Sequence, residues 1–122
     1  MGTRELHRLR RFRSDIRHGM MRAYEDELMR AHATIGTHSA SRILTRLCKH
    51  WAHHYTVTFD PDQGDIDFGG SRCRLRVTAA GLHVEVEAPA ERELIELQEV
   101  VADHLKRMAK GEPLEAAWHR DT

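Results

Sequence analysis

Apolar residues recur along the chain with two different periods, and the change of period separates the predicted elements. Between about residues 37 and 54 they recur every three or four positions, which is typical of a helix with one buried face. That face collects Leu44, Leu47, Cys48, Trp51 and Tyr55. The preceding Thr37 and Ser39 offer side-chain oxygens that cap the start of a helix. The pattern predicts a helix that ends near His54 and packs on a core.

Residues 55–88 instead alternate between apolar and polar positions, which is the period of a half-buried strand. Four strands are predicted, over residues 55–59, 65–68, 72–78 and 82–87. Proline, glycine and serine residues between them supply turns. In the third strand Cys73, Leu75 and Val77 share one face, and Arg72, Arg74 and Arg76 share the other. We therefore predict an antiparallel meander with one buried face and one solvent-exposed face. On the exposed face, arginines and glutamates pair across strands.

A second helical period begins near Pro89 and ends before Gly111 and Pro113. Its apolar stripe contains Leu94, Leu97, Val101, Leu105 and Met108. Weak alternation over residues 31–37 and 114–118 predicts a further strand on each side of the central pattern. Together these elements predict an α+β fold with a single antiparallel β-sheet, a four-strand meander plus flanking edge strands, and two helices packed on one face.

Residues 4–30 carry a third amphipathic pattern, in which apolar residues alternate with arginines. We expect an extra N-terminal amphipathic helix there, and we divide the chain into a basic extension over residues 1–29 and a single α+β domain over residues 30–122. Such a helix packs on its own domain or on a second copy, as in a homodimer. A membrane surface or a partner's groove is an alternative. A third alternative is that this segment is only an upstream extension and that the complete domain starts at Met29.

Charge and composition argue against several classes of function. The 122 residues include 19 basic and 19 acidic side chains, so the formal net charge is zero. A nucleic-acid-binding domain usually has a basic excess, and we therefore expect no nucleic-acid partner. No apolar run approaches the roughly 18 residues of a transmembrane helix, and the arginine-rich start lacks the apolar stretch of a secretory signal. We expect a cytoplasmic protein in which a disulfide between Cys48 and Cys73 is improbable.

The chain contains 10 histidines, and several of them fall on the predicted helices. His50 and His54 are four residues apart, a spacing at which two imidazoles can bind one metal ion. His104 lies on the matching flank of the last helix, and Cys48 or Cys73 could complete a site for zinc or ferrous iron. The alternative is that these histidines are ordinary helix-edge residues and the cysteines buried apolar thiols.

Four segments of this sequence resemble a bacterial family known as domain of unknown function 2218. They are Ser41–His53, Gly64–Phe68, Cys73–Leu75 and Leu97–Ala109. The resemblance covers roughly residues 31–118, and its pattern matches here at Cys48, His50, His53, Cys73 and His104. His54 stands where the family often has lysine, so the resemblance favours Cys48, His50, His53 and His104 as metal ligands. It also implies an association with siderophore and iron-uptake functions.

The leading hypothesis is thus a small accessory protein of iron or siderophore metabolism that binds a metal or a metal-bearing ligand. The alternative is a metal-free protein-interaction or dimerisation module that uses the basic helix or the charged sheet face. An enzyme is a third hypothesis, but no phosphate loop, nucleophile elbow or spaced carboxylate pair supports it. Cys48 and His50 point about 200° apart on a helix, so a Cys48 nucleophile would need His104 as its base.

Overall fold

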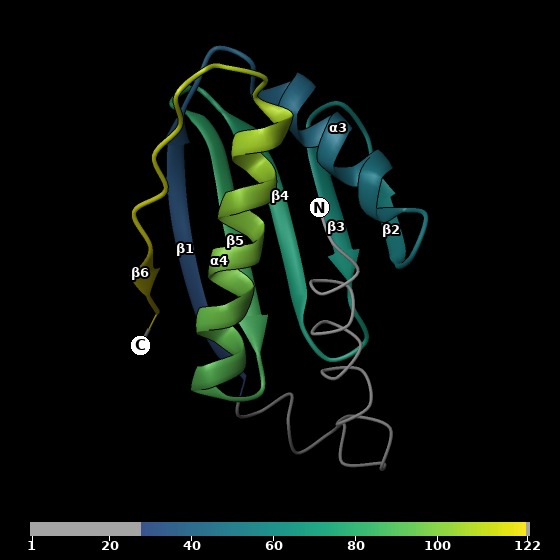
Figure 1. Cartoon of the computed structure of the whole chain (residues 1–122), viewed down its shortest axis with the longest axis vertical. Coiled ribbons are helices and arrows are strands. Elements are labelled where there is room, and N and C mark those ends of the chain that lie inside the picture. Colours follow the sequence, from purple (N-terminus) through teal and green to yellow (C-terminus); the bar gives the residue numbers. More distant parts are fainter. Residues whose placement is uncertain (1–27, 122) are drawn as a thin grey trace.

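The computed structural model describes residues 28–121, which form one antiparallel sheet with two helices on one side (Figure 1). The elements follow the predicted order. They are β1 (Met29–Gly36), α3 (Ala40–Trp51), β2 (Thr56–Phe59), β3 (Gln63–Asp67), β4 (Arg72–Thr78), β5 (Gly81–Ala88), α4 (Glu91–Met108) and β6 (His119–Arg120). The predicted helix over residues 4–30 lies outside the described residues except at its end, where Met29 and Arg30 belong to β1 instead.

The sheet has six strands in the order β2-β3-β4-β5-β1-β6. The meander from β2 to β5 follows the chain, and β1 then pairs with β5 along its whole length, from Met29 opposite Ala88 to Gly36 opposite Gly81. Gly81 has a φ of 138°, and a Cβ there would lie 2.1 Å from the carbonyl oxygen of Ile35. Only glycine therefore allows the two strands to approach this closely at that end.

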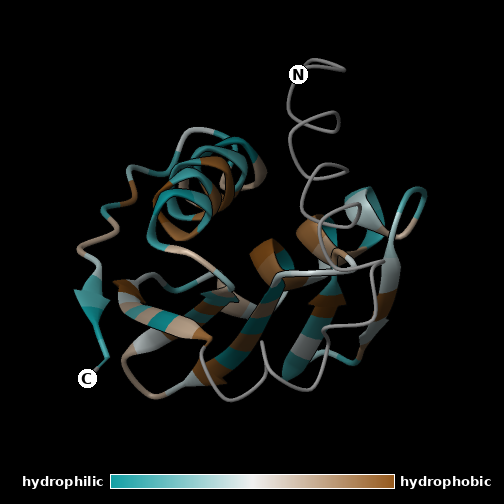
Figure 2. Ribbon diagram, turned by 90° about the horizontal axis from the view of Figure 1, so that it is seen from below, coloured by the Kyte–Doolittle hydropathy of each residue, from teal (hydrophilic) through white to brown (hydrophobic). Residues whose placement is uncertain are grey.

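The two helices divide the buried face between them (Figure 2). Helix α4 packs on β5 and β1, whereas α3 packs on β3 and β2. The predicted apolar positions form the core, with Leu44, Leu47, Trp51, Leu97 and Leu105 almost fully buried. Among the described residues, no element covers the opposite face of the sheet, which we call the open face.

Two predicted boundaries were wrong. Helix α3 ends at Trp51 and not near His54, because the amides of His54 and Tyr55 both donate to the Trp51 carbonyl and close a turn before β2. Residues 114–118 form no strand, and the edge strand β6 is only His119–Arg120. Leu114 is buried and Trp118 packs against the core, so this segment is held by its side chains rather than by backbone pairing.

Candidate functional site

The helices bring His50 and His104 together. Arg46 of α3 donates a hydrogen bond of 2.8 Å to the Met108 carbonyl at the end of α4, which fixes the two helices side by side. His50 lies one turn after Arg46, and His104 lies one turn before Met108. Their ring centroids are 5.3 Å apart. Sequence-distant histidines on two helices therefore meet at one place.

His104 is a buried histidine whose protonation state is fixed by its surroundings. Its side chain is 1% exposed, and its Nδ1 lies 2.7 Å from the Val100 carbonyl oxygen. A carbonyl only accepts hydrogen bonds, so Nδ1 carries the proton and Nε2 carries the lone pair. Burial, reinforced by His50 and Arg107 and opposed by the Val100 hydrogen bond, lowers the pKa of His104 to about 4. The imidazole is therefore neutral near pH 7.

The indole of Trp51 packs against this histidine pair. Its indole lies 4.5 Å from the His104 ring, centroid to centroid, and meets Phe68 edge-on at 5.1 Å. The indole Nε1 is buried, and none of the described residues accepts a hydrogen bond from it. A buried N–H without an acceptor is costly and uncommon. The Trp51 indole N–H is thus a buried donor on the ring that packs against His104.

Cys48 is on α3 but on a different side of it. Its Sγ faces β3, where it lies 2.6 Å from the position that a Cβ on Gly64 would take. Burial, with a further contribution from Asp65, raises the pKa of the Cys48 thiol to about 12. Burial also raises the pKa of Cys73 well above its ordinary value, and both cysteines are free thiols. Neither is activated as a nucleophile, because the thiolate is the reactive form.

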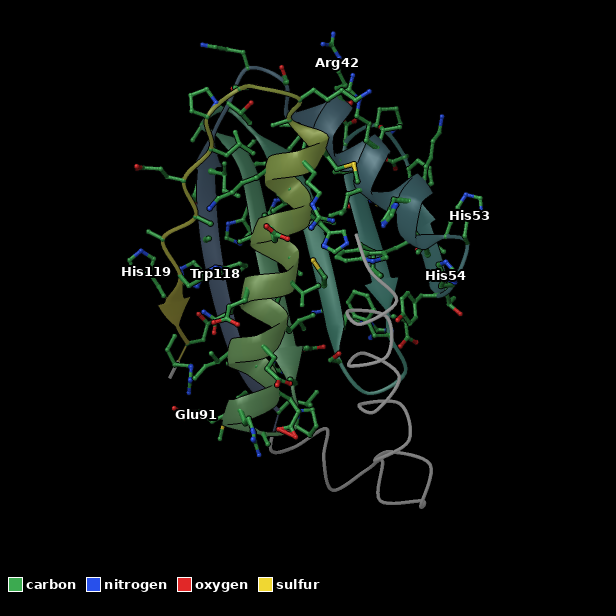
Figure 3. The ribbon with its side chains drawn as sticks, in the orientation of Figure 1. Arg42, His53, His54, Glu91, Trp118 and His119 are labelled. Atoms are coloured by element: carbon green, nitrogen blue, oxygen red, sulfur yellow. The ribbon has the colours of Figure 1, made fainter. Side chains whose placement is uncertain are left out.

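His53 and His54 lie beyond the end of α3, in an exposed turn (Figure 3). The i, i+4 relationship predicted for His50 and His54 is therefore lost, because it requires a continuous helix. Of the four predicted ligands, His50 and His104 are neighbours. Within residues 28–121, no group of three or more histidine, cysteine or acidic side chains is arranged to hold a metal ion.

The open face carries the cross-strand pairs that the alternation predicted. Arg74 of β4 lies between Asp65 of β3 at 3.8 Å and Glu85 of β5 at 3.3 Å. Farther across the sheet, His83, His32 and His119 form a row on β5, β1 and β6, with successive ring centroids 5.7 and 5.6 Å apart. This row could not be predicted from the sequence, because strand order, and not spacing along the chain, makes these residues neighbours.

The comparisons with known proteins agree with this fold. An NMR structure of PA4090 from Pseudomonas aeruginosa is 42% identical in sequence, with a TM-score of 0.60. The similarity covers 75% of this chain and 94% of that one. No curated protein matches the chain. In the part of the chain that the structure describes, no helix is both long and apolar enough to cross a membrane.

The family comparison covers most of the domain. A family model described as an uncharacterised protein conserved in bacteria, DUF2218, matches residues 32–119. This range runs from β1 to the start of β6 and includes both helices. The family resemblance identified from the four sequence segments is therefore confirmed. The chain belongs to the DUF2218 family of uncharacterised bacterial proteins.

Proposed function

We propose that this protein binds a metal-bearing ligand between α3 and α4, with His50 and His104 as ligands to the metal. It would act in the cytoplasm as an accessory protein of iron or siderophore metabolism. The observation that carries the proposal is the meeting of the two rings at 5.3 Å, with Nδ1 of His104 committed to the Val100 carbonyl. A metal-binding histidine commonly donates its other ring N–H to such a carbonyl.

The chemistry of the pair suits ferrous iron or zinc. A histidine must be neutral to bind a metal, and burial keeps His104 neutral near pH 7. Imidazole nitrogen is a good ligand for both metals. Two protein nitrogens do not complete a coordination shell, so the remaining ligands would come from the bound molecule itself. This favours a metal chelate over a bare ion.

Trp51 supports a ligand that carries acceptor atoms. Its buried indole N–H has no acceptor among residues 28–121 and lies on the ring that packs against His104. Siderophore-type chelators bind metals through oxygen atoms, and such an oxygen could accept this hydrogen bond. Cys48 and His53 are the two further metal ligands that we propose beside His50 and His104. The Cys48 thiol would first have to lose a proton that its burial retains.

The test is metal and chelate binding by the purified full chain. Fe²⁺ under anaerobic conditions, Zn²⁺, and ferric nitrilotriacetate, which leaves coordination positions open, are titrated separately by calorimetry. We expect one equivalent of at least one probe to bind, and His50→Ala to weaken binding about 100-fold or more. His54→Ala is the matched control and should bind normally, because His54 lies in the exposed turn.

The same binding measurement is made on His104→Gln, whose folding is checked by circular dichroism. Loss of binding in both His50→Ala and His104→Gln supports the proposal. Additional loss in Cys48→Ala and His53→Ala would support the complete four-residue set. Absence of binding by the unmodified protein to every probe, or unchanged binding by His50→Ala, would overturn it.

The alternative function is a metal-free interaction or dimerisation module. The observation that favours it is the open face, which presents charged side chains that no described element covers. Sedimentation velocity at low and high salt tests this alternative. A dimer that dissociates as salt rises, and that Arg74→Gln weakens, would support it. A monomer at all concentrations would count against self-association.

A further inference from the structure

The open face contains an ion-pair ladder that neutralises most of its charges. Arg72 lies 3.0 Å from Asp65 and 3.5 Å from Asp67. Arg74 pairs with Asp65, Glu85 and Glu87, and Glu87 also accepts from Arg30 at 2.9 Å. Alternating charges on four neighbouring strands thus satisfy one another. A ligand that needed a free cation would find none within this part of the face.

Arg76 is the next arginine along β4, and its surroundings differ from those of Arg72 and Arg74. Its cross-strand neighbours are Gln63 of β3 and His83 of β5, neither of which is acidic. The side chain is exposed, and no described residue forms an ion pair with it. Its positive charge is therefore not neutralised by a neighbour in the way that the charges of Arg72 and Arg74 are.

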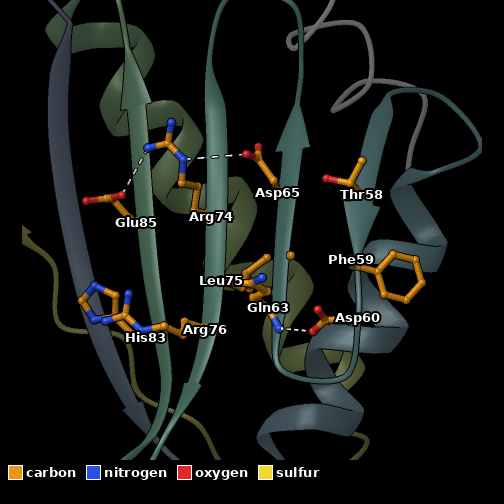
Figure 4. Close-up of a pocket in the computed structure, with 11 residues that line it drawn as sticks. Thr58, Phe59, Asp60, Gln63, Asp65, Arg74, Leu75, Arg76, His83 and Glu85 are labelled. Atoms are coloured by element: carbon orange, nitrogen blue, oxygen red, sulfur yellow. Dashed lines mark hydrogen bonds and ion pairs between the residues drawn. The ribbon is translucent and has the colours of Figure 1, made fainter.

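A hollow of about 510 Å³ lies beside Arg76 on the open face (Figure 4). Strands β2 to β5 line it, with Gln63, Arg74, Arg76 and His83 among the lining residues. Figure 4 shows Arg76 extending toward His83, with Gln63 on the other side of β4. Three side chains with N–H groups, Gln63, Arg76 and His83, thus border one hollow.

The acidic side chains of the hollow already have partners. Asp60 accepts hydrogen bonds of 2.8 and 3.0 Å from the amides of Asp62 and Gln63. Asp65 and Glu85 both lie within ion-pair distance of Arg74. These carboxylates do not neutralise Arg76, but they repel a ligand with several negative charges. The surroundings therefore favour a ligand with a single anionic group.

We infer that the open face binds a small molecule through one carboxylate or phosphate group, held by Arg76 with His83 and Gln63 as further donors. A guanidinium binds either group through paired N–H donors. This site is on the opposite side of the sheet from His50 and His104. It is independent of the proposed metal chelate, and either can fail without the other.

The test is a titration of the ¹⁵N-labelled full chain, followed by NMR chemical shifts. The probes are acetate, inorganic phosphate and citrate, each against sodium chloride at the same ionic strength. We expect saturable shifts at Gln63, Arg76 and His83 with acetate, phosphate or both, and weaker binding of citrate. Saturation with acetate alone would assign a carboxylate ligand, and saturation with phosphate alone a phosphate ligand.

Arg76→Gln removes the charge at an exposed position, so the fold should persist, as its amide spectrum will show. Binding should weaken about tenfold or more, since a charge-assisted hydrogen-bond pair contributes this much. Arg42→Gln, an exposed arginine on α3, is the matched control and should bind like the unmodified protein. Shifts that sodium chloride reproduces, tighter binding of citrate, or unchanged binding by Arg76→Gln would overturn the inference.

Discussion

The Sγ atom of Cys48 lies 2.6 Å from the place where a Cβ on Gly64 would be. Helix α3 therefore rests directly on the backbone of β3, and the absence of a side chain at residue 64 makes room for the thiol. Because Cys48 is fully buried, its Sγ has little freedom to move aside. A side chain at residue 64 would therefore clash with α3 at this point.

Gly64→Ala should consequently destabilise the protein by about 1–3 kcal/mol, because overpacking forces a shift of α3 or of β3. Urea unfolding measured by circular dichroism gives the change in the free energy of unfolding. Adding Cys48→Ala removes the clashing sulfur, and the double variant should recover part of the loss. If the effects of the two substitutions simply add, the contact does not limit the packing.

The second prediction concerns acid stability and His104. Its pKa is lowered to about 4 in the folded protein and is near 6.5 in an unfolded chain. Between these values the unfolded chain binds a proton that the folded protein excludes. The free energy of unfolding should therefore fall as pH drops from about 6.5 to about 4, by about 3 kcal/mol in total from this group.

The measurement is urea unfolding at several pH values without added metal. His104→Gln cannot titrate, so its stability should depend less on pH over this interval, whatever its stability at pH 7. His54→Ala, which removes an exposed histidine, is the control and should keep the pH dependence of the unmodified protein. Parallel curves for His104→Gln and the unmodified protein would contradict the buried neutral imidazole.

The third prediction compares two glutamates on β5. Glu87 is 6% exposed and accepts from Arg30, with Arg74 at 3.5 Å. Glu85 is more exposed and accepts a hydrogen bond from Arg74 at 3.3 Å. Glu87→Gln should cost about 1–2 kcal/mol, because it weakens a charge-assisted hydrogen bond at a buried position. Glu85→Gln should cost less than about 1 kcal/mol.

Thermal and urea unfolding of both variants at low and moderate salt would measure this difference. Salt should reduce the effect of Glu85→Gln more than that of Glu87→Gln, because exposed charges are screened more strongly. Equal losses in the two variants would mean that burial of Glu87 adds nothing to its ion pairs.

The order and faces of the elements followed from the sequence alone. Period 3.6 places Leu44, Leu47 and Trp51 on one helix face, and period 2 places Cys73 and Leu75 opposite Arg72 and Arg74. These are local properties of a helix and a strand, so no knowledge of the tertiary structure was needed. The family resemblance was also readable directly, since it depends on residue identity.

The tertiary structure alone decided which distant residues meet. The pairing of β1 with β5 placed His32 beside His83, and the antiparallel packing of α3 on α4 placed His50 beside His104. The end of α3 at Trp51 likewise depends on where β2 must begin, and it separated His54 from His50. Local periodicity fixes the face on which a side chain lies, but contacts between elements depend on strand order and helix packing, which no short stretch of sequence specifies.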